Sequence, residues 1–232
     1  MTSTSPGNRP RVIALINLKG GTAKTTSTAF LAHALHERGR RVKVIDADPQ
    51  GSTLEWQGFA DWPVPVLALP SATLHRQIWG VVDADRVDDV VIDGPPLEEQ
   101  AGVVNSILRV ATDVIVPMAP TMMELRRVPA VWKAIDDANG ARDDDPNVWV
   151  LLNRTVANAG STKTIRTTLE SSGKQVFATN IPRLEDYAQA FSSPIPLGKT
   201  GPDGAFVPGD KPYGGVVDEL LAVWRAEAEV PA

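Results

Sequence analysis

A strand, a glycine pair and the start of a helix follow one another between Val12 and Thr26, and this stretch constrains the fold more than any other. The apolar run Val12–Ile16 predicts a buried strand. Gly20 and Gly21 allow the backbone to curl so that successive N–H groups point inward. Because the first turn of a helix has unpartnered N–H groups and positive potential, the stretch predicts a phosphate site for a nucleoside triphosphate.

Lysine and threonine side chains complete this predicted phosphate site. Lys24 supplies positive charge for the outer phosphates, and the Thr25 hydroxyl is placed to hold Mg²⁺. The ordinary pattern Gly-x-x-x-x-Gly-Lys-[Ser/Thr] is not met, because Leu18 and Ala23 stand where it has glycines. The predicted nucleotide-binding residues of the loop are Lys19, Gly20, Gly21, Thr22, Ala23, Lys24, Thr25 and Thr26.

Carboxylates follow two later apolar strands. Asp46 and Asp48 come at the end of the predicted strand 41–46, and Asp93 ends strand 90–92 ahead of Gly-Pro-Pro. Open α/β sheets bind ligands at the carboxyl ends of their strands, so these carboxylates are expected beside the phosphate site, where a metal ion and water must be positioned. For the first pair, an ordinary surface turn is the alternative, since Asp, Pro and Gly are common in turns.

Three motifs in this order resemble the ParA/MinD family of ATPases. Residues 19–25 read Lys-Gly-Gly-x-x-Lys-Thr, as in the deviant Walker A motif of that family. Residues 46–51 read Asp-x-Asp-Pro-Gln-Gly, like its switch I. Within residues 87–96, the strand that ends at Asp93 resembles its Walker B motif, and Gly94-Pro95-Pro96 resembles its switch II. The resemblance covers about residues 11–225 and is nearest to a short ParA, without the N-terminal DNA-reading domain of long members.

The resemblance implies the cofactors ATP and Mg²⁺ and a division of roles within the site. Lys19 would cross to the partner's nucleotide in an ATP-bound homodimer, and Asp48 would orient the attacking water. The implied catalytic residues are Lys19, Lys24 and Asp48, and the implied metal-site residues are Thr25, Asp46 and Asp93. In this superfamily an Asn at the position of Asn153 reads the adenine, and a Pro at the position of Pro182 lines the base. The alternative is that the Asn only caps a turn.

Basic residues gather late in a chain whose net charge is −5. Between residues 154 and 183 there are five basic residues and one acidic residue, Glu170, so this segment carries +4. Such local contrast favours contact with the phosphates of non-specific duplex DNA, and family members bind DNA through this region. Solvated surface charge is the alternative. The candidate DNA-binding residues are Arg154, Lys163, Arg166, Lys174 and Arg183.

Alternation of apolar strands and helical patterns predicts an α/β fold. We expect a doubly wound, mostly parallel sheet flanked by helices, like that of P-loop NTPases, in a single domain over residues 11–232 after a disordered lead of residues 1–10. The chain has no cysteine, which fits a reducing cytoplasm, and no apolar run approaches the roughly 20 residues of a membrane span. A cytoplasmic protein without membrane attachment is therefore expected, and the resemblance to ParA proteins implies association with the nucleoid.

The expected function is DNA partition, for a plasmid or a chromosome. An ATP-driven sandwich dimer would bind non-specific DNA and hydrolyse ATP when a ParB-like centromere-binding partner stimulates it. Two alternatives stay open: a ParA-like ATPase that positions a protein cargo, and a nucleotide-switched binding module in which Ala23 leaves little turnover. A biosynthetic enzyme that activates a carboxylate is disfavoured, because that class lacks Lys19 in its loop.

Overall fold

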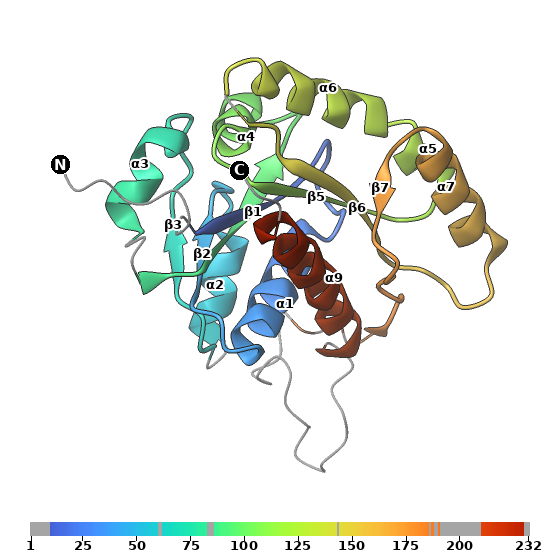
Figure 1. Cartoon of the computed structure of the whole chain (residues 1–232), viewed down its shortest axis with the longest axis horizontal. Coiled ribbons are helices and arrows are strands. Elements are labelled where there is room, and N and C mark those ends of the chain that lie inside the picture. Colours follow the sequence, from blue (N-terminus) through green and yellow to red (C-terminus); the bar gives the residue numbers. More distant parts are fainter. Residues whose placement is uncertain are drawn as a thin grey trace, which may run out of the picture.

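One parallel sheet forms the centre of the molecule. The computed structural model describes residues 10–59, 62–82, 86–142, 144–185, 187, 190 and 210–229. Seven strands lie in the order β3-β2-β4-β1-β5-β6-β7, and every neighbouring pair is parallel (Figure 1). The strands are β1 Arg11–Asn17, β2 Val42–Asp46, β3 Val66–Ala68, β4 Asp89–Pro96, β5 Asp113–Met118, β6 Asn147–Leu152 and β7 Gln175–Val176. The predicted doubly wound α/β fold is confirmed, and the expected lead of residues 1–10 lies, except for Pro10, outside the described residues.

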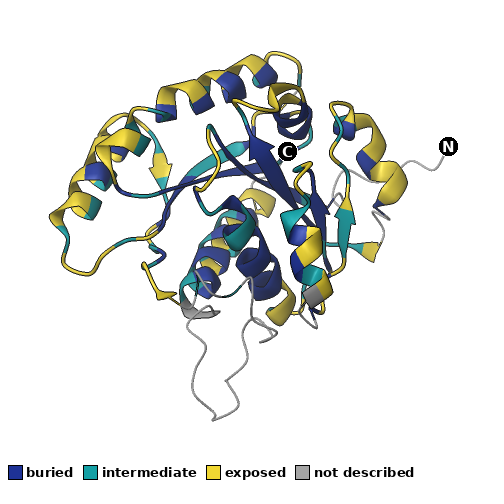
Figure 2. Cartoon of the chain, turned by 180° about the vertical axis from the view of Figure 1, so that it is seen from behind, coloured by how far each residue is buried: buried dark blue, intermediate teal, exposed yellow. Residues whose placement is uncertain are grey.

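Helices cover both faces of this sheet (Figure 1). They are α1 Lys24–Glu37, α2 Ser52–Phe59, α3 Leu74–Val81, α4 Ala101–Leu108, α5 Met122–Leu125, α6 Val128–Asn139, α7 Gly160–Ser171 and α9 Asp210–Ala228. Successive side chains of a strand point to opposite faces, so Ile13 and Leu15 pack with α1, α2 and α9, whereas Val12 and Ala14 pack with α3, α4 and α6. Figure 2 shows the central strands almost wholly buried between the two layers. Among the described helices, none combines the length and apolarity that a bilayer span needs.

Several helix boundaries differ from the sequence prediction, which expects one helix over residues 122–139 that Pro129 kinks or whose start it limits, a helix over 161–172 with Ser161 as its N-cap, a loop over 198–213 and a last helix over 216–228. The single helix expected over 122–139 is two helices, α5 and α6, and Pro129 stands in the first turn of the second, where its missing N–H costs least. Helix α7 begins at Gly160, so Ser161 lies inside the helix rather than at its N-cap. Helix α2 was not predicted, and α9 begins at Asp210 instead of Val216; the expected loop from 198 falls mostly outside the described residues.

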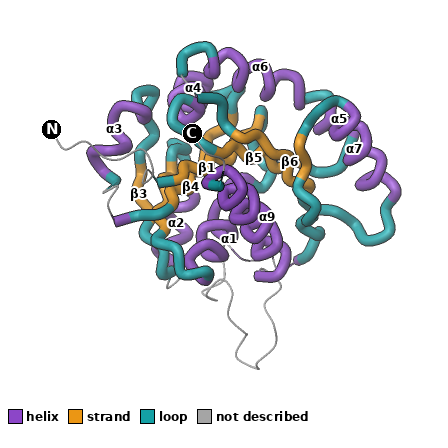
Figure 3. Tube along the Cα trace, in the orientation of Figure 1, coloured by secondary structure: helices purple, strands orange, loops and turns teal. Residues whose placement is uncertain are grey.

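Helix α9 returns across the sheet to lie beside α1 (Figures 1 and 3). Its Tyr213 hydroxyl lies 3.0 Å from the Ser27 hydroxyl of α1. Gly215 makes a close approach possible, because a Cβ there would stand 2.8 Å from the Thr179 hydroxyl oxygen. The last helix therefore reaches both the start of α1 and the segment that follows β7.

Candidate functional site

The loop between β1 and α1 is the centre of the candidate site. Ala23 lies in the left-handed region, with φ 67° and ψ 30°, which explains physically why glycine is usual at this position. Gly94, at the neighbouring end of β4, passes so close that a Cβ there would stand 2.8 Å from the Leu15 carbonyl oxygen. The ends of β4 and β1 that lead to the site are thus packed backbone against backbone.

Lys24 is buried at the start of α1. Its ammonium group donates to the Lys19 carbonyl oxygen at 3.1 Å, so it spans the loop from one side to the other. Burial lowers the pKa of Lys24, while the nearby carboxylates of Asp93 and Asp48 act in the opposite direction. A phosphate group placed in this loop would supply the negative charge that the buried ammonium lacks.

Asp93 is the buried carboxylate of the site. One of its oxygens, Oδ2, accepts hydrogen bonds from the hydroxyls of Thr25 and Thr53, each at 2.7 Å. Burial raises the pKa of Asp93 to about 6, against the stabilising effect of the two hydroxyls. Sequence reasoning did not single out Thr53, whose only signal is that it follows the Asp-x-Asp-Pro-Gln-Gly segment.

Asp46 lies beside this group and caps a helix. Its carboxylate accepts backbone N–H groups of Thr53 at 2.9 Å, Leu54 at 3.0 Å and Asp48 at 3.2 Å, and so holds the first turn of α2. Burial raises the pKa of Asp46 despite these three bonds. The side chain of Asp48 is less buried and accepts the N–H of Gln50 at 3.0 Å.

The oxygen atoms of this group suit Mg²⁺. Thr25 donates its proton to Asp93, which leaves the lone pairs of its hydroxyl oxygen for a cation. Within the part of the chain that the structure describes, no three His, Cys, Asp or Glu side chains form a metal cage. Mg²⁺ commonly binds through one or two carboxylates, water and substrate phosphates, so the predicted set of Thr25, Asp46 and Asp93 fits that mode.

A cavity of about 930 Å³ opens next to the loop and is suited to a base and sugar. Asn153 and Pro182 line it, together with Ala23 and Thr26. The Asn153 side chain is buried, and its Nδ2 donates to the Thr22 carbonyl oxygen at 2.8 Å. Its Oδ1 is buried and has no hydrogen-bond partner among the described residues.

Lys19 points its charge away from the buried part of the site. Its side chain is 45% exposed, and its ammonium group lies 3.2 Å from Glu98 Oε2. Loop residues Lys19 and Lys24 therefore have different surroundings, one at the surface and one buried.

The five candidate DNA-binding residues have different surroundings in the structure. Arg154 and Arg183 line the base cavity, and Lys163 is exposed on α7. Lys174 lies over the Trp132 ring, with its ammonium 4.6 Å from the ring centroid. Arg166 donates to backbone carbonyls of the segment after β7. The positive charge of this region is thus divided between the site, an exposed helix face and internal contacts.

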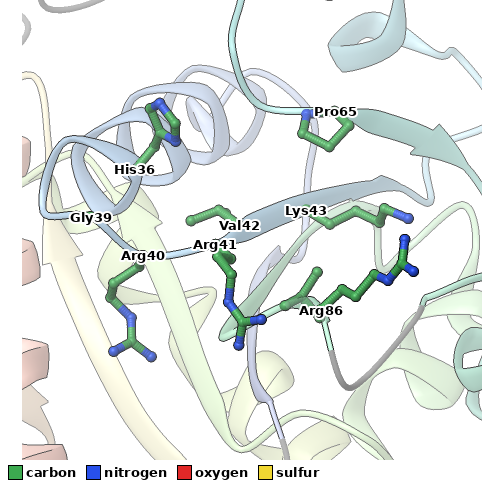
Figure 4. Close-up of a pocket in the computed structure, with 9 residues that line it drawn as sticks. His36, Gly39, Arg40, Arg41, Val42, Lys43, Pro65 and Arg86 are labelled. Carbon is green, nitrogen blue, oxygen red and sulfur yellow. The ribbon is translucent and has the colours of Figure 1, made fainter.

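A second cavity, of about 520 Å³, lies at the opposite edge of the sheet, where β2 begins (Figure 4). Its lining includes the cations Arg40, Arg41, Lys43 and Arg86. Arg40 is paired with the buried Asp89, and Arg41 with Asp88 at 2.7 Å. At least two of these guanidinium groups therefore neutralise carboxylates of the protein itself.

Comparison with known proteins agrees with this geometry. Residues 13–197 match the model of the CobQ/CobB/MinD/ParA nucleotide binding domain. The "Maintenance of carboxysome distribution protein A" of Halothiobacillus neapolitanus is 29% identical over 204 residues, which are 85% of this chain and 91% of that protein.

Two solved structures share the fold. Cobyrinic acid a,c-diamide synthase from Mycobacterium smegmatis, with bound ADP and magnesium, has a TM-score of 0.71 at 25% identity and covers 96% of this chain and 98% of its own. A putative plasmid partition protein from Borrelia burgdorferi B31, bound to AMPPNP, has a TM-score of 0.70 at 18% identity. The match covers 93% of this chain and 100% of that protein's chain. The ADP and magnesium bound to the first of these structures agree with the expected cofactors, ATP and Mg²⁺. Since the family model matches well over half of its length, the chain belongs to the CobQ/CobB/MinD/ParA nucleotide-binding domain family.

Proposed function

We propose that this protein is a Mg²⁺-dependent ATPase of the ParA type, which works as an ATP-bound homodimer on non-specific duplex DNA. The buried Lys24 and the oxygen atoms around Asp93 support binding of a nucleoside triphosphate with a metal ion. The unpartnered acceptor of Asn153 supports a base with an exocyclic amino group, such as adenine.

The position of Lys19 is the main observation that supports an ATP-bound homodimer. Lys24 already spans the loop, so Lys19 is not needed for the phosphates of its own subunit. Its contact with Glu98 is a surface ion pair, which is worth about 0–1 kcal/mol and can be exchanged at little cost. A cation supplied by a partner in this way can raise the rate of hydrolysis by roughly 10³–10⁵-fold in GTPases.

Apolar side chains around the site support an interface at the same edge. Met122 is 61% exposed and Met123 is 65% exposed, and both follow the carboxyl end of β5. Val156 and Leu184 are also exposed and line the rim of the base cavity. Exposed apolar groups gathered at one face favour burial against another protein surface, which here would be a second copy of the chain.

The decisive experiment measures hydrolysis, dimer formation and DNA binding together. Wild type should bind duplex DNA with ATP but not with ADP or without nucleotide, and salt should weaken that binding. Lys24→Ala should lose nucleotide binding and with it DNA binding. Lys19→Ala should still bind ATP but lose dimer formation and stimulated hydrolysis. If Lys19→Ala dimerised and hydrolysed ATP like wild type, Lys19 would not act on the nucleotide of the partner subunit.

The cargo has two candidates. DNA partition would need a ParB-like centromere-binding partner that stimulates hydrolysis. Positioning of a protein assembly is the second candidate, because a protein named for carboxysome distribution matches nearly the whole chain. ATP binding without DNA binding in any nucleotide state would favour the protein cargo. Stimulation by a centromere-binding protein bound to its DNA site would favour partition.

Ala23 supports a third possibility, a nucleotide-switched binding module with little turnover. A non-glycine residue in the left-handed region is strained, so the loop can be slow to reach its reactive geometry. A phosphate-release assay separates this possibility from a true ATPase. Nucleotide-dependent DNA binding with no phosphate release, even with a stimulating partner, would identify the switch.

A further inference from the structure

One wall of the base cavity includes residues 181–183, which end the segment 177–183 that we name the base loop. Ile181, Pro182 and Arg183 of this loop line the cavity. On one side the loop is joined to the end of β6, where Ile181 N–H donates to the Leu152 carbonyl at 2.9 Å and Arg183 N–H to the Thr155 carbonyl at 2.9 Å. The segment before Ile181 leaves the sheet after the two-residue strand β7, so its backbone groups need other partners.

Glu219 of α9 accepts hydrogen bonds from backbone N–H groups of that segment. Its two carboxylate oxygens accept the N–H groups of Ala178 and Thr179, one each, and both distances are 2.8 Å. A carboxylate that binds two consecutive amides uses charge-assisted hydrogen bonds, which are about twice as strong as neutral ones. Gly215, one turn earlier on the same helix, is what allows α9 to lie this close to Thr179.

Arg166 of α7 takes the acceptors of the same segment from another element. Its Nη2 donates to the Phe177 carbonyl oxygen at 2.7 Å, to Asn180 Oδ1 at 2.8 Å and, more weakly, to the Ala178 carbonyl at 3.4 Å. The planar guanidinium can hold several acceptors in fixed directions, which the ammonium of a lysine cannot do. An anion and a cation from two helices thus bind two N–H groups, two carbonyl oxygens and one side-chain oxygen of residues 177–180.

We propose that Glu219 and Arg166 are positioning residues that hold the base loop and thereby set the affinity for the base of the bound nucleotide. Neither side chain lines the cavity, so both act through the loop. The proposal rests on the proposed nucleotide-binding function. It also gives Arg166, first considered a DNA-binding residue, a role inside its own subunit.

Two ligands separate an effect on the base from an effect on the phosphates: Mg²⁺·AMPPNP, and Mg²⁺·tripolyphosphate, which has no base or sugar. Titration calorimetry of Glu219→Gln and Arg166→Gln should show AMPPNP affinity about 10-fold below wild type, with tripolyphosphate affinity unchanged. Glu219→Gln keeps the size of the side chain but removes its charge and one acceptor. Thermal melting of each variant confirms that it is folded.

Matched controls come from the same kinds of elements. Asp218→Asn changes the neighbouring acid on α9, whose partner is Arg38, and should leave both affinities unchanged. Lys133→Gln removes a cation whose contact is an i,i+4 ion pair on α6 with Asp137, and should also have no effect. Because Glu219 and Arg166 act on one loop, the double variant should lose less affinity than the two single losses combined.

The outcomes distinguish this inference from the proposed function. The positioning role would be overturned if Glu219→Gln and Arg166→Gln lowered the affinities for AMPPNP and tripolyphosphate equally. It would also be overturned if they lowered AMPPNP affinity no more than Asp218→Asn does. If Asn153→Ala weakens AMPPNP but Glu219→Gln and Arg166→Gln do not, only the positioning role fails. If wild type binds AMPPNP no more tightly than tripolyphosphate, the base site itself fails and the positioning role fails with it.

Discussion

Two buried aspartates, Asp93 and Asp113, lie at opposite edges of the same sheet and have different hydrogen-bonding and charged partners. Asp93 lies at the carboxyl edge and, among the described residues, is hydrogen-bonded through the hydroxyls of Thr25, Thr53 and, at 3.5 Å, Thr28. Asp113 begins β5 at the other edge, where the Trp224 indole N–H donates to it at 3.0 Å.

Cationic and amide groups complete the surroundings of Asp113. The Arg11 guanidinium lies 3.8 Å from its Oδ2, and Asn147 Nδ2 donates to its Oδ1 at 3.3 Å. Burial raises the pKa of Asp113 as it does for Asp93, but four groups of the protein oppose that effect. The guanidinium groups of Arg11 and Arg40 also lie over the Trp224 ring of α9.

We interpret the difference as one edge that the protein closes with its own side chains and one edge that is available to a ligand. At the Asp113 edge the chain supplies its own positive charge, so the buried carboxylate is part of the structure. At the Asp93 edge the compensating charge is incomplete, and a metal ion with its phosphates would complete it. The comparison predicts that substitutions at Asp113 change stability and that substitutions at Asp93 change ligand binding.

The largest effect is expected at the closed edge. Asp113→Ala should lower the free energy of unfolding by about 3–5 kcal/mol, because it leaves the Trp224 indole, Asn147 and Arg11 without their buried partner. Chemical denaturation measures this loss. Asp88→Ala, which removes a partly exposed pair with Arg41, should change the same quantity by less than about 1 kcal/mol. Equal losses in the two variants would contradict the comparison.

The pH dependence of stability should reveal that the charge of Asp93 is only partly compensated, since burial outweighs the two hydroxyls and the nearby Lys24. Its pKa of about 6 in the fold exceeds the ordinary 3.8, so the folded state binds the proton more tightly than the unfolded chain does. Without metal and nucleotide, stability from this group is full below about pH 3.8 and is lost as pH rises through about 6, by roughly 3 kcal/mol. The measurement is the difference in unfolding free energy between wild type and Asp93→Asn across this range. A difference that does not vary with pH would show that Asp93 is already compensated.

Asp93→Asn should separate stability from activity. Hydrolysis of ATP should fall by at least about 10²-fold, because the amide cannot attract Mg²⁺ as the carboxylate does. Near neutral pH, the melting temperature of the unliganded variant should nevertheless equal or exceed that of wild type, because a desolvated charge is removed. Phosphate release and thermal melting test the two halves. A large fall in melting temperature would place Asp93 with Asp113 as a structural residue.

The smallest effect is expected in the loop itself. Ala23→Gly should raise stability by about 1 kcal/mol or less, because glycine adopts a φ of 67° without the Cβ clash. Ala222→Gly, an exposed position inside α9, should lower stability by about 1 kcal/mol. Opposite signs for the same chemical change would confirm local strain at Ala23. A fall in both variants would refute it.

Features with a local cause could be predicted from the sequence. The apolar runs predicted the buried strands, because a strand covered on both faces is apolar at consecutive positions. The spacing of Lys24 from the glycine pair predicted the loop, and the position of Asp93 after a strand predicted a carboxylate beside it. The roles of Asn153 and Pro182 came only from the resemblance, and the structure places both in the wall of the base cavity.

Features made by distant partners could not be predicted. Helix α2 is short and carries no strong apolar period, and its first turn is held by Asp46 of the preceding strand. Thr53 matters only because that turn brings its hydroxyl to Asp93, 40 residues later. The sequence suggested that Arg166 was a surface cation available to DNA, whereas its guanidinium donates to the Phe177 carbonyl oxygen of the base loop.

By itself, the sequence determined the parallel α/β fold and the phosphate loop, because strand burial, chain turning and helix starts depend on residues close together along the chain. The tertiary structure decided which charges are compensated. Trp224 meets Asp113 across 111 residues, and Glu219 meets Thr179 across 40, through the packing of α9. Whether a buried charge is structural or available to a ligand depends on such contacts, because desolvation and pairing are set by neighbours in space.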